Sequence, residues 1–142
     1  MTVLKVCRVD GAELPKYAHK NDAGLALCST ETVLIFPQER KFVSTGIAVD
    51  IPAGHVGLIH PRSGMALNHG ITVLNAPGTI DSGYHGEIKV ILYNTSSDTY
   101  RIDPGDKIAQ LVIQEYVKVW IDEVSVLGDS ERGTNGFGSS GK

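Results

Sequence analysis

This chain of 142 residues has few cysteines, few aromatic residues and no excess of positive charge. Its two cysteines, Cys7 and Cys28, do not form a CxxC pair, so the sequence indicates neither a disulfide framework nor a zinc site. We expect both to be buried, reduced packing residues. The five histidines fall at none of the spacings typical of metal ligands, so we expect no metal site made by the protein alone.

Positive charge and long apolar runs are also lacking. The formal net charge of -3 favours no bulk polyanion, so we expect no nucleic-acid partner. No apolar run approaches the roughly 18 residues of a membrane-spanning helix. The start MTVLKVCRVDG lacks the basic residues and the long apolar stretch of a signal peptide. We therefore expect a cytoplasmic protein with no membrane contact.

Short β-rich runs separated by proline and glycine make up most of the chain. This pattern predicts an all-β fold in which many short strands form a sandwich or a barrel. The predicted strands are Val3–Cys7, Thr32–Phe36, Lys41–Val49, His55–His60, Ile71–Leu74, Glu87–Tyr93 and Lys107–Val119. The one segment that favours a helical turn is Ser63–Asn68, where a serine cap precedes helix-tolerant residues.

The end of the chain differs in composition from the rest. From Gly128 onward the sequence GDSERGTNGFGSSGK has no periodicity and is rich in glycine and serine. This predicts a flexible arm, residues 128–142, attached to a β domain, residues 1–127. A disordered tail has a similar composition. Arg132 and Phe137 favour instead a flap that closes over an anionic ligand carrying a ring.

The strongest functional signal is GTIDSGYHGE, residues 78–87. It puts Asp81 and Tyr84 on a glycine-rich turn between two apolar runs. This predicts a tight hairpin whose backbone approaches a ligand while both side chains face it. An ordinary surface hairpin has the same composition, so other segments must decide between the two interpretations.

Three further segments carry residues suited to binding a nucleotide. In PRSGMA, Arg62 can bind phosphate oxygens in bidentate fashion beside the Ser63 hydroxyl and the Gly64 N–H. Gln110, inside the apolar run GDKIAQLVI, either faces solvent or orients water or phosphate. Asn75 is either a simple turn residue or a reader of a base edge, since its amide both donates and accepts.

Together these segments resemble the five ordered motifs of the trimeric dUTP pyrophosphatase (dUTPase) family. AGLAL resembles the first motif, PRSGMA the second, GTIDSGYHGE with Asn75 the third, GDKIAQLVI the fourth and RGTNGFGSSG the fifth. Five motifs in the right order are a specific match, and they extend over nearly the whole chain. The resemblance implies a distorted jelly-roll-like β-barrel, a homotrimer with three shared active sites, and Mg²⁺-dependent hydrolysis of dUTP to dUMP and pyrophosphate.

The resemblance also implies roles for residues of the third motif. Asp81 would be the general base that activates water for in-line attack on the α-phosphorus. Tyr84 would pack under the deoxyribose and leave no room for a ribose 2′-OH. Asn75 would read the uracil edge. The other substrate-binding residues beside them would be Thr79, Ile80 and Lys89.

The phosphates would be held by a neighbouring subunit. Arg62, Ser63 and Gly64 would bind them, and Gln110 would assist the reaction there. Phe137 of the C-terminal arm would stack over the uracil. The arm residues that close on the phosphates would be Arg132, Gly138, Ser139 and Ser140. The Mg²⁺ ion would be held by triphosphate oxygens and waters, with no direct protein ligand.

One residue departs from the family pattern. The first motif usually reads A-G-x-D-L, and here Ala26 stands in place of the aspartate that helps to organise the waters around the metal. We expect this change to reduce activity without removing the base. The alternative is a regulatory or signalling protein that binds dUTP with weak or no catalysis. A dCTP deaminase, which shares this fold, is disfavoured because Ile91 stands where that family has its catalytic glutamate.

Overall fold

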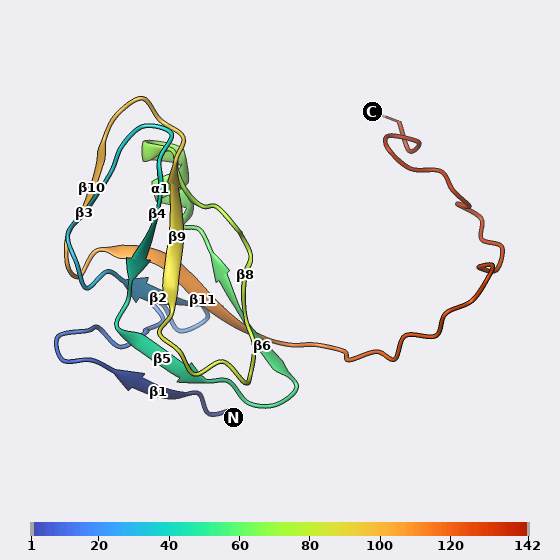
Figure 1. Ribbon diagram of the computed structural model, residues 1–142, viewed down its shortest axis with the longest axis horizontal. Coiled ribbons are helices and arrows are strands. Elements are labelled where there is room, and N and C mark those ends of the chain that lie inside the picture. The colour runs from blue at the N-terminus through green and yellow to red at the C-terminus, as the bar shows by residue number, and fades with distance from the viewer. Residues whose placement is uncertain (1, 142) are drawn as a thin grey trace.

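The computed structural model describes residues 2–141. Most of these residues belong to a body built from β-strands, with one short helix (Figure 1). The all-β prediction is confirmed. The elements in chain order are β1 (Lys5–Arg8), β2 (Gly24–Cys28), β3 (Val33–Ile35), β4 (Arg40–Ser44), β5 (Ile47–Asp50), β6 (His55–His60), α1 (Ser63–His69), β7 (Ile71–Val73), β8 (Gly78–Ile80), β9 (Lys89–Asn94), β10 (Tyr100–Ile102) and β11 (Lys107–Glu115). No helix within residues 2–141 is long and apolar enough to cross a membrane.

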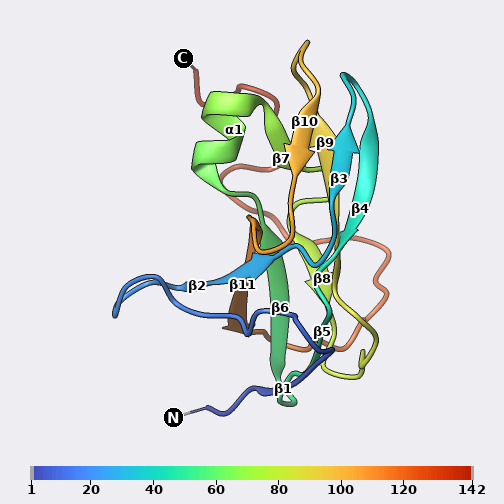
Figure 2. The same ribbon diagram turned by 90° about the vertical axis from the view of Figure 1, so that its left-hand side faces the viewer.

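Within the described residues the strands form four antiparallel sheets and not the closed barrel that the family resemblance implied. The largest sheet has the order β2-β11-β6-β8, and a second has the order β4-β9-β7. The pairs β1-β5 and β10-β3 make up the other two (Figure 2). Consecutive strands β8 and β9 therefore belong to different sheets, which determines the shape of the loop between them.

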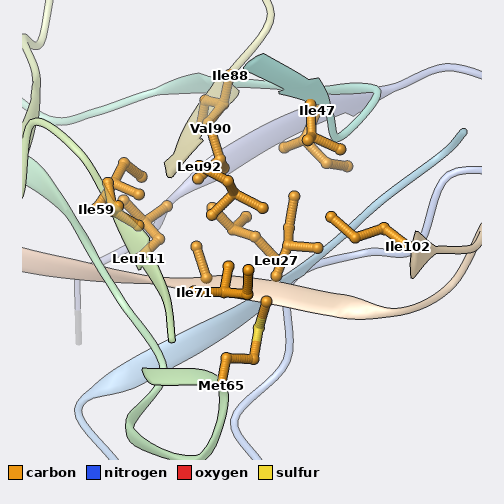
Figure 3. Close-up of a cluster of buried hydrophobic side chains, with 14 of the residues drawn as sticks. Leu27, Ile47, Ile59, Met65, Ile71, Ile88, Val90, Leu92, Ile102 and Leu111 are labelled. Atoms are coloured by element: carbon orange, nitrogen blue, oxygen red, sulfur yellow. The ribbon is translucent and has the colours of Figure 1, made fainter. Parts of the chain in front are cut away.

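Side chains from these sheets meet in one hydrophobic core. Val90 and Leu92 point inward at alternate positions of β9, as expected for a strand with one buried face. In Figure 3 they lie above Leu27 and Ile71, and Met65 of α1 closes the opposite end of the cluster. The core fixes the sheets relative to one another, and so it fixes the loops that carry the predicted site residues.

The helix lies where the sequence predicts it and extends to His69. Met65 is its buried residue. After the helix, Gly70 adopts a left-handed conformation with a φ of 65°, and its N–H points to the carbonyls of Met65 and Ala66. Glycine adopts this conformation without steric cost, so Gly70 ends α1 and allows β7 to begin at the next residue.

Several strand predictions need correction. The run Lys41–Val49 is two strands, because Gly46 has a φ of 66° and interrupts the extended backbone between β4 and β5. The run Lys107–Val119 ends as a strand at Glu115. Strands β2, β8 and β10 were not predicted, because each is short or begins at a glycine.

The prediction that both cysteines are buried is wrong for Cys7. This residue lies exposed on β1, which pairs only with β5 within residues 2–141, so one face of the strand meets solvent. Cys28 is half-buried at the end of β2. Both thiols are free within the described part of the chain.

Candidate functional site

The loop between β8 and β9 borders a surface pocket of about 510 Å³. Asp81 begins its turn, and the Tyr84 N–H donates a hydrogen bond of 3.0 Å to the Asp81 carbonyl. The pocket is lined by Thr79, Ile80, Asp81, Tyr84 and Lys89, all predicted site residues, and by Glu87 and Ile88. The fold thus brings together a carboxylate, a phenol ring and an ammonium group at one pocket.

This loop is a crossover between sheets and not the tight hairpin that the sequence predicts. β8 pairs with β6, where Ile80 lies opposite Gly57, whereas β9 pairs with β4 and β7. A Cβ atom at Gly57 would lie 3.2 Å from the Ile80 Cβ and 2.7 Å from Ile51, so the glycine allows this close packing. Because β8 and β9 diverge, the loop opens into a pocket that a two-residue hairpin turn would not provide.

Glu87 anchors the far end of the loop, a role that the sequence analysis missed. Its Oε1 accepts a hydrogen bond of 2.9 Å from the N–H of Gly46, in the turn between β4 and β5. Next to it, the buried Thr45 hydroxyl donates a bond of 2.6 Å to the carbonyl of Ile88. The signal in the sequence was an acidic residue directly before an apolar strand, inside a motif whose other residues already had roles.

Lys89 and Asn75 lie at different ends of this region. The Lys89 Nζ lies 3.9 Å from the Glu87 carboxylate and 4.9 Å from the ring centroid of Phe42, so its charge is held at the pocket edge. Asn75 is exposed in the turn before β8. A Cβ at Gly78 would lie 3.3 Å from the Asn75 amide nitrogen, so that amide lies close over the strand.

A second group of predicted residues lies where β2, β11 and the end of β6 meet. Gln110 is half-buried there, and its Nε2 donates a bond of 3.1 Å to the Pro61 carbonyl. The same side chain lies against Gly24, where any Cβ would collide with it. Gln110 therefore joins the first, second and fourth motifs, and it does not simply face solvent.

Arg62 is fixed at the same place. Its Nη1 donates a bond of 2.9 Å to the carbonyl of Lys107, at the start of β11. Within residues 2–141 the Arg62 guanidinium makes no ion pair. Ser63 and Gly64 follow it, exposed in the first turn of α1, where backbone N–H groups have no partner in the helix. These donors can bind an anion.

Ala26 lies directly opposite Gln110 in the β2-β11 pair, on the outer face of the sheet. On its other side, its N–H donates a bond of 2.8 Å to the carbonyl of Lys16. A carboxylate at this position would lie beside Gln110. Within residues 2–141 no cluster of three histidine, cysteine or acidic residues is suited to hold a metal ion.

The charges near Ala26 are mostly positive. Burial raises the pKa of the neighbouring Cys28 thiol, and the Glu13 carboxylate contributes in the same direction. The cations of Lys107, Arg62 and Lys16 act in the opposite direction on that pKa. The residues around Ala26 thus present more cationic than anionic groups, which suits a polyanionic ligand.

The two groups of residues lie apart within one chain. Ile80, next to Asp81, pairs with Gly57 in β6, and Arg62 follows Gly57 by five residues. At about 3.3 Å per residue, this separation along β6 is on the order of 15 Å. Asp81 and Arg62 of one chain therefore lie toward opposite ends of β6.

The fifth-motif residues lie away from both groups. After β11 the chain leaves the body and extends into solvent without returning to the pocket (Figure 1). Phe137 is fully exposed, and the Arg132 Nε donates only to the nearby Asn135 carbonyl at 2.8 Å. The segment before it is also exposed, although it carries the apolar residues Val117, Val119, Trp120, Ile121, Val124, Val126 and Leu127.

The chain is similar to curated enzymes of several bacteria. It is 50% identical over 139 residues to the deoxyuridine 5′-triphosphate nucleotidohydrolase of Clostridium tetani, with 98% of this chain and 95% of that protein covered. It is 55% identical over 130 residues to the protein of the same name from Clostridium kluyveri, with 92% and 91% covered.

Solved structures show the same fold. The Staphylococcus bacteriophage 80alpha dUTPase with dUPNHPP superposes with a TM-score of 0.93 at 34% identity, over 100% of both chains. A variant of the phage phi11 dUTPase of S. aureus, whose structure describes a structural Mg(II) ion, gives 0.81 at 32% identity over 88% of this chain and 98% of that one. The dUTPase family profile matches residues 10–141. The chain belongs to the dUTPase family.

Proposed function

We propose that this chain is a cytoplasmic enzyme that hydrolyses dUTP to dUMP and pyrophosphate, with Asp81 as the general base. The observation that carries the proposal is the pocket in which the Asp81 carboxylate and the Tyr84 ring lie on one loop. A carboxylate needs only hydrogen-bond reach to a water to activate it for in-line attack on the α-phosphorus. Pyrophosphate then leaves on the opposite side.

The nucleoside half of dUTP binds along β8 and the loop after it. The Tyr84 ring packs under the deoxyribose, so that a ribose 2′-OH has no room. Asn75 reads the uracil edge, since its amide offers a donor and an acceptor. Thr79 and Ile80 line the same pocket, and the Lys89 ammonium contacts the substrate from the strand that leaves it.

The triphosphate half binds at the second group of residues. Arg62, whose guanidinium has no carboxylate partner in residues 2–141, binds phosphate oxygens together with Ser63 and Gly64. Gln110, fixed by its bond to the Pro61 carbonyl, orients water or phosphate beside them. A Mg²⁺ ion would be held there by phosphate oxygens and waters, with no direct protein ligand, and would supply charge neutralisation beside Arg62.

The complete site lies between subunits of a homotrimer. The separation of Asp81 from Arg62 within one chain supports this, because residues from two subunits can together surround one triphosphate. The arm, residues 128–142, closes over the site of another subunit: Phe137 stacks on the uracil and Arg132 binds phosphate, with Gly138, Ser139 and Ser140 beside them. Such closure excludes water and holds the substrate for attack.

A pyrophosphate-release assay with dUTP, dCTP, dTTP and UTP, each with and without Mg²⁺, tests the proposal. We expect rapid release from dUTP with Mg²⁺ and a loss of about 10²- to 10⁴-fold in kcat for Asp81→Asn. Asp98→Asn, which changes an exposed carboxylate far along the chain, is the matched control. Unchanged turnover in Asp81→Asn would overturn the role of Asp81, and ammonia from dCTP would indicate a deaminase.

Ala26 supports a second candidate function, a regulatory protein that binds dUTP and hydrolyses it slowly or not at all. The position opposite Gln110 lacks a carboxylate that could order metal-bound waters. Tight dUTP binding with no pyrophosphate release, even at high Mg²⁺, is the result that distinguishes this function from catalysis. Calorimetric titration of dUTP, followed by the release assay on the same sample, measures both.

A further inference from the structure

The Tyr84 ring lies against the backbone of Gly86, two residues further along the same loop. A Cβ atom at Gly86 would lie 2.6 Å from the Tyr84 Oη, 2.7 Å from its Cζ and 3.0 Å from its Cε2. Such distances are far inside van der Waals contact, so no side chain fits at Gly86 while the ring stays where it is. The glycine has no left-handed φ, so the requirement comes from the ring and not from the backbone conformation.

Two hydrogen bonds hold the same tyrosine to both ends of the loop. The Tyr84 N–H donates to the Asp81 carbonyl at 3.0 Å, and its hydroxyl donates to the Glu87 carbonyl at 2.9 Å. The Glu87 carboxylate is in turn bound to the Gly46 N–H. The ring is therefore attached, through Glu87, to the turn between β4 and β5.

We infer that Gly86 is a positioning residue that holds the Tyr84 ring as a fixed wall of the pocket and thereby sets the discrimination between deoxyribose and ribose. This rests on the proposed role of Tyr84 as the surface under the sugar. The Tyr84 ring excludes a ribose 2′-OH only if the ring cannot move away from the sugar. The glycine lets the ring lie close to the loop backbone, with its hydroxyl bonded to Glu87, so the ring has little freedom to move.

The chain offers a matched pair of glycines for the test. Gly86→Ala places a methyl group where the ring lies, whereas Gly83→Ala adds the same methyl to the same loop at a position with no atom within 4 Å. We expect Gly86→Ala to lower the ratio of kcat/KM for dUTP to that for UTP by about 10-fold or more, and Gly83→Ala to change it less than about 2-fold. Equal selectivity in the two variants overturns the inference.

Tyr84→Phe tests the same geometry without any added atom. It keeps the ring and removes the bond to Glu87, so we expect a smaller loss of selectivity than in Gly86→Ala and a fall in melting temperature of a few degrees at most. This variant decides the question if Gly86→Ala does not fold. Selectivity as high as that of the unmodified chain contradicts the inference.

A measurement on the free protein separates this inference from the proposed function. A Gly86 α-proton that points at the Tyr84 ring has a ring-current shift, which we expect to disappear in Tyr84→Leu and to persist in Gly83→Ala. Absence of that shift in the unmodified chain overturns the geometry, whatever the activity. Absence of pyrophosphate release from dUTP by the unmodified chain, with the shift present, overturns the proposed function and leaves the ring position intact.

Discussion

At the scale of single residues, Gln110 and Gly24 show how the motifs depend on one another. Gln110 lies over Gly24 and bonds to the Pro61 carbonyl, so a glutamine in one motif needs a glycine in another. Ala26 shares this surface, because it lies opposite Gln110. From the sequence alone Gln110 had two interpretations, since strand alternation does not say which face of the sheet carries a ligand.

Introducing a carboxylate beside Gln110 should change the metal requirement of the proposed reaction. We expect Ala26→Asp to lower the Mg²⁺ concentration for half-maximal activity by about 10-fold, because a carboxylate there can accept hydrogen bonds from metal-bound waters. Titration of pyrophosphate release against Mg²⁺ measures this.

Ala18→Asp is the control for that titration, since Ala18 and Ala26 line the same pocket. It adds an equal charge without facing Gln110, and the Mg²⁺ dependence should stay as it is. If both variants shift the Mg²⁺ titration equally, the added negative charge alone causes the shift, and the position of residue 26 does not matter.

At the scale of elements, periodicity and turn residues predicted where most strands lie. His55–His60 was predicted with its observed bounds, because its flanking residues stop the strand at both ends. The pairing of strands could not be predicted in the same way. The apolar runs on either side of the third motif are typical of a hairpin, but β8 pairs with β6 in another sheet, where Ile80 packs closely against Gly57.

The small β1-β5 sheet carries a charge cluster whose effect depends on pH. The Lys5 ammonium, as the larger cause, and the His85 ring hold the pKa of the Asp50 carboxyl below its ordinary value of 3.8. His85 belongs to the pocket loop, and its Nε2 lies 3.2 Å from the Asp50 carboxylate. Asp50 therefore links β5 to the loop that carries Asp81.

The pKa of the Asp50 carboxyl is lower in the folded state than in the unfolded state. The ionised carboxylate therefore stabilises the fold at pH values above 3.8, the ordinary pKa, and this stabilisation is lost as the pH falls through the lowered pKa of the folded state. We expect Asp50→Asn to lower the melting temperature by a few degrees at most near pH 6, and this difference to shrink as the pH falls below 3.8. Scans of both proteins across this range measure the difference. If the difference in melting temperature between the two proteins became larger as the pH falls, the lowered pKa of Asp50 would not be its cause.

At the scale of the whole molecule, the single chain presents two separate groups of predicted site residues and a C-terminal segment that is exposed. The sequence does not say that the loop carrying Asp81 and the residue Arg62 lie toward opposite ends of β6. Nor does it show that an apolar segment stays uncovered after Glu115, because exposure depends on tertiary contacts. These features explain why the proposed site needs a neighbour.

Trp120, which is 99% exposed, tests the role of that segment. If the segment docks on a neighbouring subunit, Trp120→Glu buries a carboxylate in an apolar interface, which costs several kcal/mol. We expect this variant to elute as a monomer with a folded body, as measured by light scattering and circular dichroism. Lys118→Glu adds a carboxylate to the same segment without removing apolar surface, and it should remain trimeric. A trimeric Trp120→Glu variant would show that the segment does not hold the assembly together.

The C-terminal arm has a consequence for inheritance. A chain with Asp81→Asn keeps an unmodified arm, residues 128–142, and a chain with Phe137→Ala keeps the Asp81 base. In a mixed trimer, each chain can therefore supply the group that the other lacks. When the two inactive proteins are unfolded together and refolded in equal amounts, about one quarter of the sites should combine an intact base with an intact arm. Arms that served their own chain would give no such rescue. Two damaged gene copies in one cell would then restore an activity that neither encodes alone.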